Sequence, residues 1–347
     1  MKRAAIAVLS ILSNVGMAAA QAPAVPVTVD NFIRAESDLY LANLAKESGG
    51  LAKFRHHREL APIDAQTVIR LNRDTLYSGA VVDLDAGPVT VTMPDSGPRF
   101  MSLMTVNQDH YTNTVYGAGP HTIDRAKVGT RYALLGIRTL VNPNDPKDVA
   151  QVHALQDAIK IDQKGTGKLE LPEWDPVTQK KVRDALLVLA STMPDFRHSF
   201  GADSDVSHIR HLIATAAAWG GNPDKDAVYL NVTPAKNDGT TVYRLNVGSV
   251  PVDAFWSVSL YDANGYYEKN PYNAYTVNSL TGRKGSDGTT AIQFGGCDGK
   301  IPNCLPIMNG WNYTVRLYRP RQEILNGSWK FPEPQPVQTG EGRAVKP

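Results

Sequence analysis

Residues 255–261 read Phe-Trp-Ser-Val-Ser-Leu-Tyr, and residues 311–318 read Trp-Asn-Tyr-Thr-Val-Arg-Leu-Tyr. In the second stretch, Trp311 and Leu317 fall on one face of an extended chain, whereas Asn312 and Arg316 fall on the other. This period of two predicts half-buried strands rather than helices. The same alternation occurs at residues 89–93 and 242–247, and residues 132–141 form another expected strand.

Helical patterns lie between these strands and before them. A helix is predicted from a cap at Thr28 or Asp30 to about residue 46. The dipeptides at 145–146 and 175–176, both Asp-Pro, each place a capping residue before a proline, which is a helix-start signal. A third helix is expected around residues 209–216. We therefore predict a mainly β protein with an α insert (α+β), in which a helical segment joins two jelly-roll or β-sandwich-like domains.

The patterns divide the chain into segments. Residues 28–62 form an N-terminal helix and a connection, and residues 63–143 form the first β domain. Residues 144–222 form the helical segment, residues 223–330 form the second β domain, and residues 331–347 form a Pro-rich tail that we expect to be flexible. The chain has 347 residues, of which 42% are hydrophobic, so it is long enough to bury two cores.

The N-terminus is typical of an export signal. Lys2 and Arg3 precede an apolar run at residues 4–12, and small residues follow at 18–20. This pattern predicts a signal peptide that is cleaved after Ala20, and hence a protein exported to the periplasm or the exterior. No later stretch approaches the roughly 20 apolar residues of a membrane helix, so we expect no membrane insertion.

The charge of the chain limits the classes of partner that it can bind, and its cysteines indicate the cellular compartment. The sequence carries 36 Lys plus Arg against 34 Asp plus Glu, and the excess lies in Lys2 and Arg3. A neutral remainder gives no electrostatic reason to bind nucleic acid, and it mildly favours association into a homo-oligomer. The only cysteines, Cys297 and Cys304, are expected to pair in an oxidising compartment, with two free thiols as the alternative.

Three longer strings carry a family resemblance. They are Asn-Arg-Asp-Thr-Leu-Tyr-Ser at 72–78, Val-Asn-Gln-Asp-His-Tyr at 106–111, and residues 255–262 together with Asn-Pro-Tyr-Asn at 270–273 and Arg-Leu-Tyr at 316–318. In these the chain resembles exported bacterial proteins that have an N-terminal DUF1254 domain and a C-terminal DUF1214 domain. The resemblance implies two jelly-roll-type β domains joined by a helical region. It also implies a carboxylesterase-like activity, a label that some members carry. One departure is Cys304, which stands where family members often have a tryptophan.

Hydrolysis needs a nucleophile or a general base. No Gly-x-Ser-x-Gly sequence occurs, which disfavours an α/β-hydrolase. A catalytic arrangement of Ser78, His110 and an acid remains open, because such triads are recognised by geometry. The alternative is that Ser78 is an ordinary strand or turn residue.

Two clusters supply further candidates. Arg73 is a candidate clamp for a substrate carboxylate and Asp74 a candidate base, although both could instead pin a loop. Asp109 or His110 is an alternative base. The phenols that could donate to an oxyanion are those of Tyr77 and Tyr111.

Aromatic residues suggest a binding role as an alternative to catalysis. Trp256, Tyr261 and a tyrosine-rich stretch up to residue 275 could stack a sugar or an aromatic ligand, or could fill the gap between domains. No cofactor motif is present, so we expect no cofactor. His208 and His211 flank an apolar stripe and are better explained as partly buried helix residues, so we expect no metal. Two functions follow: a cofactor-independent hydrolase of small esters or amides, or a non-enzymatic β-sandwich protein for glycan or small-molecule binding or for self-assembly.

Overall fold

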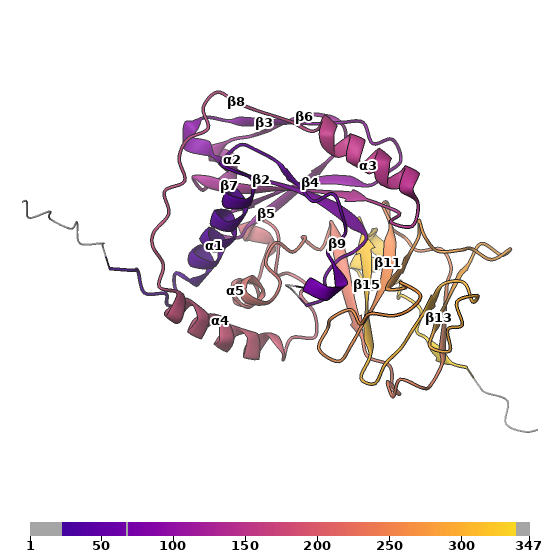
Figure 1. Ribbon diagram of the computed structural model, residues 1–347. Helices are drawn as coiled ribbons and strands as arrows, with labels where there is room; N and C mark the ends of the chain where they lie inside the picture. Colours follow the sequence, from indigo (N-terminus) through magenta and orange to yellow (C-terminus); the bar gives the residue numbers. More distant parts are fainter. Residues whose placement is uncertain (1–22, 67–68, 338–347) are drawn as a thin grey trace, which may run out of the picture.

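The computed structural model describes residues 23–66 and 69–337 (Figure 1). The predicted signal peptide and the last ten residues of the chain lie outside the described residues. Two β-sandwich-like domains lie side by side, and helices cover one face of the first (Figure 1). The predicted α+β class is confirmed.

The N-terminal domain is a sandwich of a five-stranded and a three-stranded sheet, in the orders β1-β2-β7-β4-β5 and β6-β3-β8. Apolar residues between the sheets, such as Val82, Val89 and Leu103, are fully buried. Val81 points to the opposite face, where the helices cover it, so β2 is buried on both sides. The strands are β1 (Arg55–His56), β2 (Thr75–Asp83), β3 (Val89–Met93), β4 (Met101–Asn107), β5 (Thr112–Tyr116), β6 (Gly119–Ile123), β7 (Tyr132–Leu140) and β8 (Lys160–Gln163).

Helices α1, α4 and α5 form a third layer beneath the five-stranded sheet (Figure 1). Leu41 of α1 packs against Tyr132 of β7, and Phe32 packs with Leu186 and Ile213 of the other two helices. Each Asp-Pro pair starts a helix, because the aspartate side chain accepts from backbone N–H groups of the first turn. The helices are α1 (Phe32–Glu47), α2 (Arg125–Val128), α3 (Pro146–Ala158), α4 (Pro176–Ala190), α5 (His208–Ala217) and α6 (Gln322–Leu325), with short 3-10 turns at Ile63–Ala65, Leu84–Ala86 and Asp203–Asp205.

The C-terminal domain packs two four-stranded sheets, ordered β14-β13-β10-β16 and β12-β11-β15-β9. Its core includes Trp311, which is fully buried, and Val315 and Leu317 from the same face of β15. The strands are β9 (Ala227–Val232), β10 (Tyr243–Val247), β11 (Trp256–Tyr261), β12 (Thr276–Asn278), β13 (Thr290–Phe294), β14 (Cys304–Leu305), β15 (Asn312–Tyr318) and β16 (Gln335–Pro336).

Two segments differ from the sequence-based expectation. Residues 160–163 fall within the predicted helical segment, yet they form β8 and pair with β3. The tail that was expected to be flexible from residue 331 begins with Phe331, which is 9% exposed and packs against Trp256. Its next residues form β16 on the edge of β10, so this part of the tail belongs to the sandwich.

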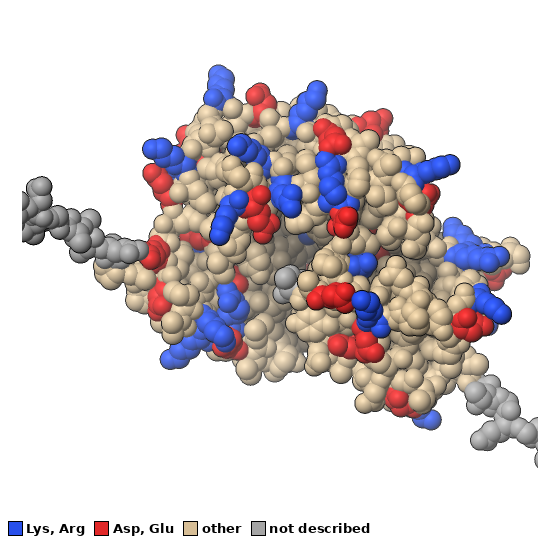
Figure 2. Space-filling view, viewed as in Figure 1, with Lys and Arg blue, Asp and Glu red and all other residues tan. Residues whose placement is uncertain are grey.

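The charged surface agrees with the neutral composition. Acidic and basic side chains are interspersed over the face in Figure 2 and form no patch of one sign there. Among the described residues, no helix is long and apolar enough to cross a membrane.

Candidate functional site

The polar face of β15 contacts the segment 70–78 of the N-terminal domain through hydrogen bonds. Asn72 Nδ2 donates to the hydroxyls of Tyr77, at 3.0 Å, and Tyr318, at 3.3 Å. Arg70 Nη1 donates to Asn312 Oδ1 at 2.8 Å. The first and third family strings are therefore brought together at the boundary between the domains.

Asp74 is fully buried at this boundary. Its Oδ1 accepts from Asn278 Nδ2 at 2.9 Å and from Thr276 Oγ1 at 3.5 Å, and both of these residues lie on β12 of the C-terminal domain. Its Oδ2 has no hydrogen-bond partner among the described residues. An unsatisfied buried carboxylate oxygen is costly and therefore requires an explanation.

Arg316 supplies the nearby positive charge. Its Nη1 donates to Ser259 Oγ at 2.9 Å, and its Nη2 donates to the carbonyl of Arg70 and the hydroxyl of Tyr261, both at 2.7 Å. Burial alone would lower the pKa of this guanidinium, but the adjacent phenols and the Asp74 carboxylate raise it well above its usual value. Arg316 thus stays charged and compensates Asp74.

Arg73 lines a cleft of about 370 Å³ between the domains. Its guanidinium donates to the Ala61 carbonyl and lies 5.4 Å from the ring centre of Tyr275. Burial lowers the pKa of Arg73. The cleft is lined from both domains: Leu76 and Val141 belong to the first, and Asn273, Tyr275, Thr276, Asn278 and Thr281 belong to the second.

Ser78 is buried beside a histidine that sequence reasoning did not select. Its Oγ lies 2.8 Å from Nδ1 of His56, its cross-strand neighbour on β1, and accepts from Gln156 Nε2 at 3.3 Å. Burial, and then Arg58, lower the pKa of His56. Neither Ser78 nor His56 lines the cleft between the domains.

His110 is held elsewhere, under α5. Its Nε2 accepts from the Gly220 backbone N–H at 2.8 Å, so Nδ1 carries the proton and donates to Thr215 Oγ1 at 2.8 Å. Burial, and then His211, lower the pKa of His110 well below its usual value. This histidine is neutral, and each ring nitrogen is engaged by the protein. The structure does not join Ser78 to His110.

The other residues of the second string are also engaged by the protein. Asp109 forms an ion pair with Arg34 of α1. Tyr111 donates its hydroxyl to Asp203, and burial, followed by that aspartate, raises its pKa to about 12. None of the residues at 109–111 lines the interdomain cleft.

Trp256 and Tyr261 face protein rather than solvent, whereas Tyr272 of the tyrosine-rich stretch is 42% exposed. Trp256 is 6% exposed and belongs to the C-terminal core. Tyr261 is fully buried and donates its hydroxyl to the Leu71 carbonyl at 2.9 Å. Tyr77 bonds with Asn72 at the domain boundary. Tyr261 therefore lies in the gap between the domains, as the second of the two interpretations from the sequence proposed, whereas Trp256 lies inside the C-terminal sandwich.

Sequence reasoning missed Thr276 and Asn278, which hold Asp74, because neither stands in a recognisable motif. One sequence signal indicated Arg316. It is a charged residue within an alternating strand, and it shares the polar face of that strand with Tyr318. Cys297 and Cys304 form a disulfide, as predicted. No cluster of three metal-ligating side chains occurs in residues 23–66 and 69–337.

Comparison with known proteins identifies both domains. Residues 51–136 match the family described as a protein of unknown function (DUF1254), and residues 227–322 match a family with the same description (DUF1214). No curated protein matches the sequence.

Two solved structures share the fold. The VPA0106 protein from Vibrio parahaemolyticus is 19% identical, with a TM-score of 0.68 over 89% of this chain and 98% of that one. A putative uncharacterized protein from Burkholderia cenocepacia is 15% identical, with a TM-score of 0.50 over 88% and 86% of the two chains. The chain therefore belongs to the family of proteins that carry an N-terminal DUF1254 domain and a C-terminal DUF1214 domain.

Proposed function

We propose that this protein is an exported binding protein for a small organic anion, and that the ligand's carboxylate binds Arg73 in the interdomain cleft. One observation carries the proposal. Arg73 lines the cleft but forms no ion pair with a described carboxylate, and its only hydrogen bond found there is to the Ala61 carbonyl. Guanidinium has five N–H donors, so most of them remain for a bidentate partner.

The rest of the cleft suits a small ligand with an apolar body. Its volume of about 370 Å³ lies near the lower end of the roughly 300–1,000 Å³ typical of small-molecule sites. Leu76 and Val141 offer apolar contact, whereas Thr276 and Asn278 offer hydroxyl and amide groups. Tyr267 and Tyr275 flank the guanidinium of Arg73 and hold it in place.

Export is part of the proposal and rests on two features. Residues 1–20 have the pattern of a cleavable signal peptide. The Cys297–Cys304 disulfide fits an oxidising compartment outside the cytoplasm.

Isothermal titration calorimetry of the purified protein against short aliphatic and aromatic carboxylates tests the binding site. We expect Arg73→Gln to weaken binding by about tenfold or more, because a charge-assisted bond contributes roughly 1.5–3 kcal/mol. Arg244→Gln is the matched control, since Arg244 is exposed on β10 and forms no ion pair with a described residue. Equal affinity in Arg73→Gln, or no binding across the set, would contradict the proposal.

Hydrolysis of a bound ester or amide is a second candidate. The observation that favours it is Asp74 Oδ2, which has no partner and belongs to a carboxylate bonded to two cleft residues. In this scheme the Thr276 hydroxyl relays a proton from water to Asp74, hydroxide adds to the carbonyl, and the leaving group takes that proton.

Asp74→Asn keeps the size of the side chain and removes its basicity. If Asp74 is the general base, ester turnover falls by about 10²–10⁴-fold while carboxylate binding remains. Turnover that survives in Asp74→Asn would reject the hydrolytic scheme and leave the binding proposal standing.

A further inference from the structure

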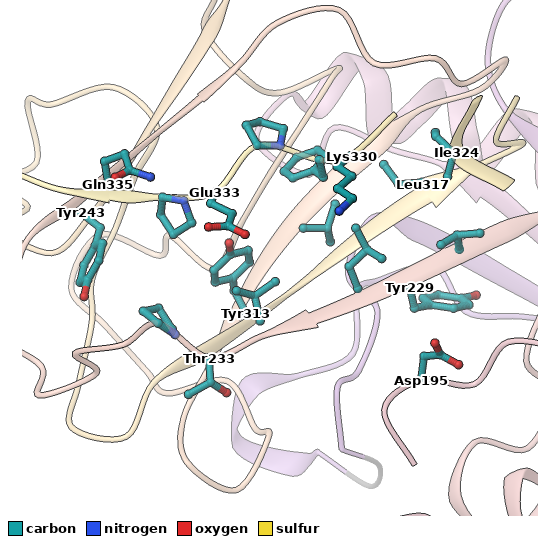
Figure 3. Close-up of a pocket in the computed structure, with 18 of the residues that line it drawn as sticks. Asp195, Tyr229, Thr233, Tyr243, Tyr313, Leu317, Ile324, Lys330, Glu333 and Gln335 are labelled. Atoms are coloured by element: carbon teal, nitrogen blue, oxygen red, sulfur yellow. The ribbon is translucent and has the colours of Figure 1, made fainter. Parts of the chain in front are cut away.

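A second cavity, of about 800 Å³, lies mainly in the C-terminal domain, and Asp195 and Arg197 of the preceding segment also line it (Figure 3). It lies between β9 and the segment at residues 327–336. Strands β9 and β16 are each the last strand of their sheet, and the two edges do not pair with one another. The space between the sheets is therefore open at this side of the sandwich.

Side chains that alternate inward along two neighbouring strands make the wall apolar. Val228 and Leu230 come from β9, and Val315 and Leu317 come from β15. Phe331 closes the opposite side from the C-terminal segment. A wall of this kind gives a hydrocarbon chain close contact and offers it no competing hydrogen bonds.

Charged groups at the rim favour an anion. The lining carries the cations Lys236, Lys330 and Arg197 but only two carboxylates, Asp195 and Glu333. Asp195 is already paired with an arginine outside the lining. The cations of the lining therefore outnumber the carboxylates that are free to pair with them, and an anionic ligand would supply the missing negative charge.

Two of these cations lack full partners. Lys330 forms no ion pair with a described carboxylate, and Figure 3 shows its amino group directed into the cavity. Arg197 donates through Nη2 to the carbonyls of Ile324 and Leu325, but its buried Nε has no hydrogen-bond partner. The remaining carboxylate, Glu333, lies beside the hydroxyl of Tyr313 and forms no ion pair with Lys330 (Figure 3).

We propose that this cavity binds a long-chain carboxylate, with the alkyl chain between the two sheets and the head group at Lys330. A neutral chain of the same length would contact the apolar wall but would leave the Lys330 ammonium without an ion pair. A cationic chain would place like charges together at the rim. The site is separate from the Arg73 cleft, and neither proposal depends on the other.

Displacement of a dansylated fatty acid from the purified protein tests this site, with palmitate, hexadecanol and hexadecyltrimethylammonium as competitors below their micellar concentrations. We expect palmitate to compete best, by about tenfold over hexadecanol, because only the carboxylate pairs with Lys330. Native mass spectrometry of the same samples should show one palmitate per chain.

Two variants test separately where the head group and the alkyl chain of the ligand bind. Lys330→Gln should remove the preference for palmitate over hexadecanol while leaving hexadecanol binding unchanged, and Lys284→Gln, at an exposed loop position, is the control. Leu230→Trp should fill the cavity and abolish binding of both. If thermal unfolding shows that Leu230→Trp is not folded, Val232→Phe on the same strand replaces it.

Four results would overturn the proposal. The first three are no displacement by palmitate, equal competition by all three compounds, and unaltered binding in a folded cavity-filling variant. A palmitate complex that appears only with two chains would also overturn it, because the cavity would then be an interface between copies.

Discussion

A single side chain, that of Arg316, joins the two β domains by donating hydrogen bonds to both. Its guanidinium donates to the carbonyls of Arg70 and Leu71 in the first domain and to Ser259 and Tyr261 in the second. The same side chain is 3% exposed. A buried charge of this kind is tolerated only when it is fully hydrogen-bonded and compensated, here by Asp74.

Replacement of this residue should therefore destabilise the protein strongly. We expect Arg316→Met to lower the free energy of unfolding by about 3–5 kcal/mol, because it leaves the Asp74 carboxylate buried without a compensating charge. Urea denaturation followed by circular dichroism measures the change. Arg244→Met, on an exposed strand face, should change stability by less than about 0.5 kcal/mol. A loss at Arg316 as small as the control's would show that the charge is not needed.

Single residues were also the hardest part of the site to predict. The sequence left an arrangement of Ser78 with His110 open, but the imidazole that bonds Ser78 is that of His56. Register across an antiparallel pair decides this contact, and register depends on the partner strand. Similarly, Thr276 and Asn278 reach Asp74 only because β12 lies against the other domain.

Elements with strong patterns were predictable and weak ones were not. The expected strands at 89–93, 132–141 and 255–261 are β3, β7 and β11 to within one residue at each end. Strand β8 was missed because its four residues contain one apolar side chain, Ile161, and carry too little alternation. Its pairing with β3, about 70 residues earlier, supplies what the local sequence lacks.

Helix α3 is held to the first sandwich by an ion pair that should be visible in the pH dependence of stability. Asp148 in its first turn accepts from Arg99, which precedes β4, and from the Asn142 backbone N–H at 2.7 Å. Burial alone would raise the pKa of Asp148, but these bonds hold it below the usual 3.8. A depressed pKa contributes stability above the unfolded value, and this contribution is lost as the pH falls through the folded value.

We therefore expect Asp148→Asn to destabilise the protein by about 1.5–3 kcal/mol at pH 7. The difference from the wild type should shrink as the pH falls below 3.8, the ordinary aspartate value. Urea titrations at a series of pH values measure it. Asp184→Asn, an exposed aspartate on α4, is the control and should show little effect at any pH. A constant difference down to pH 3 would mean that the side chain's shape, and not its charge, matters.

At the scale of the whole molecule, the boundary between the two sandwiches is partly apolar and partly polar. Phe100 and Leu140 of the first domain pack with Phe255 and Tyr318 of the second. Asn72, Asp74 and Arg316 occupy that boundary, and the Arg73 cleft opens beside it. The first and third family strings thus have a structural role, because they make polar contacts that fix one domain against the other. The same contacts give the cleft a wall from each domain, so a ligand there would bridge both.

A crystal structure of the protein with the carboxylate that binds most tightly would show whether Arg73 holds the ligand. We predict that the carboxylate lies in the interdomain cleft, with both oxygens within hydrogen-bond distance of the Arg73 guanidinium and the ligand body between Val141 and Thr276. A ligand bound elsewhere, with Arg73 unmoved and the cleft filled by water alone, would contradict this prediction.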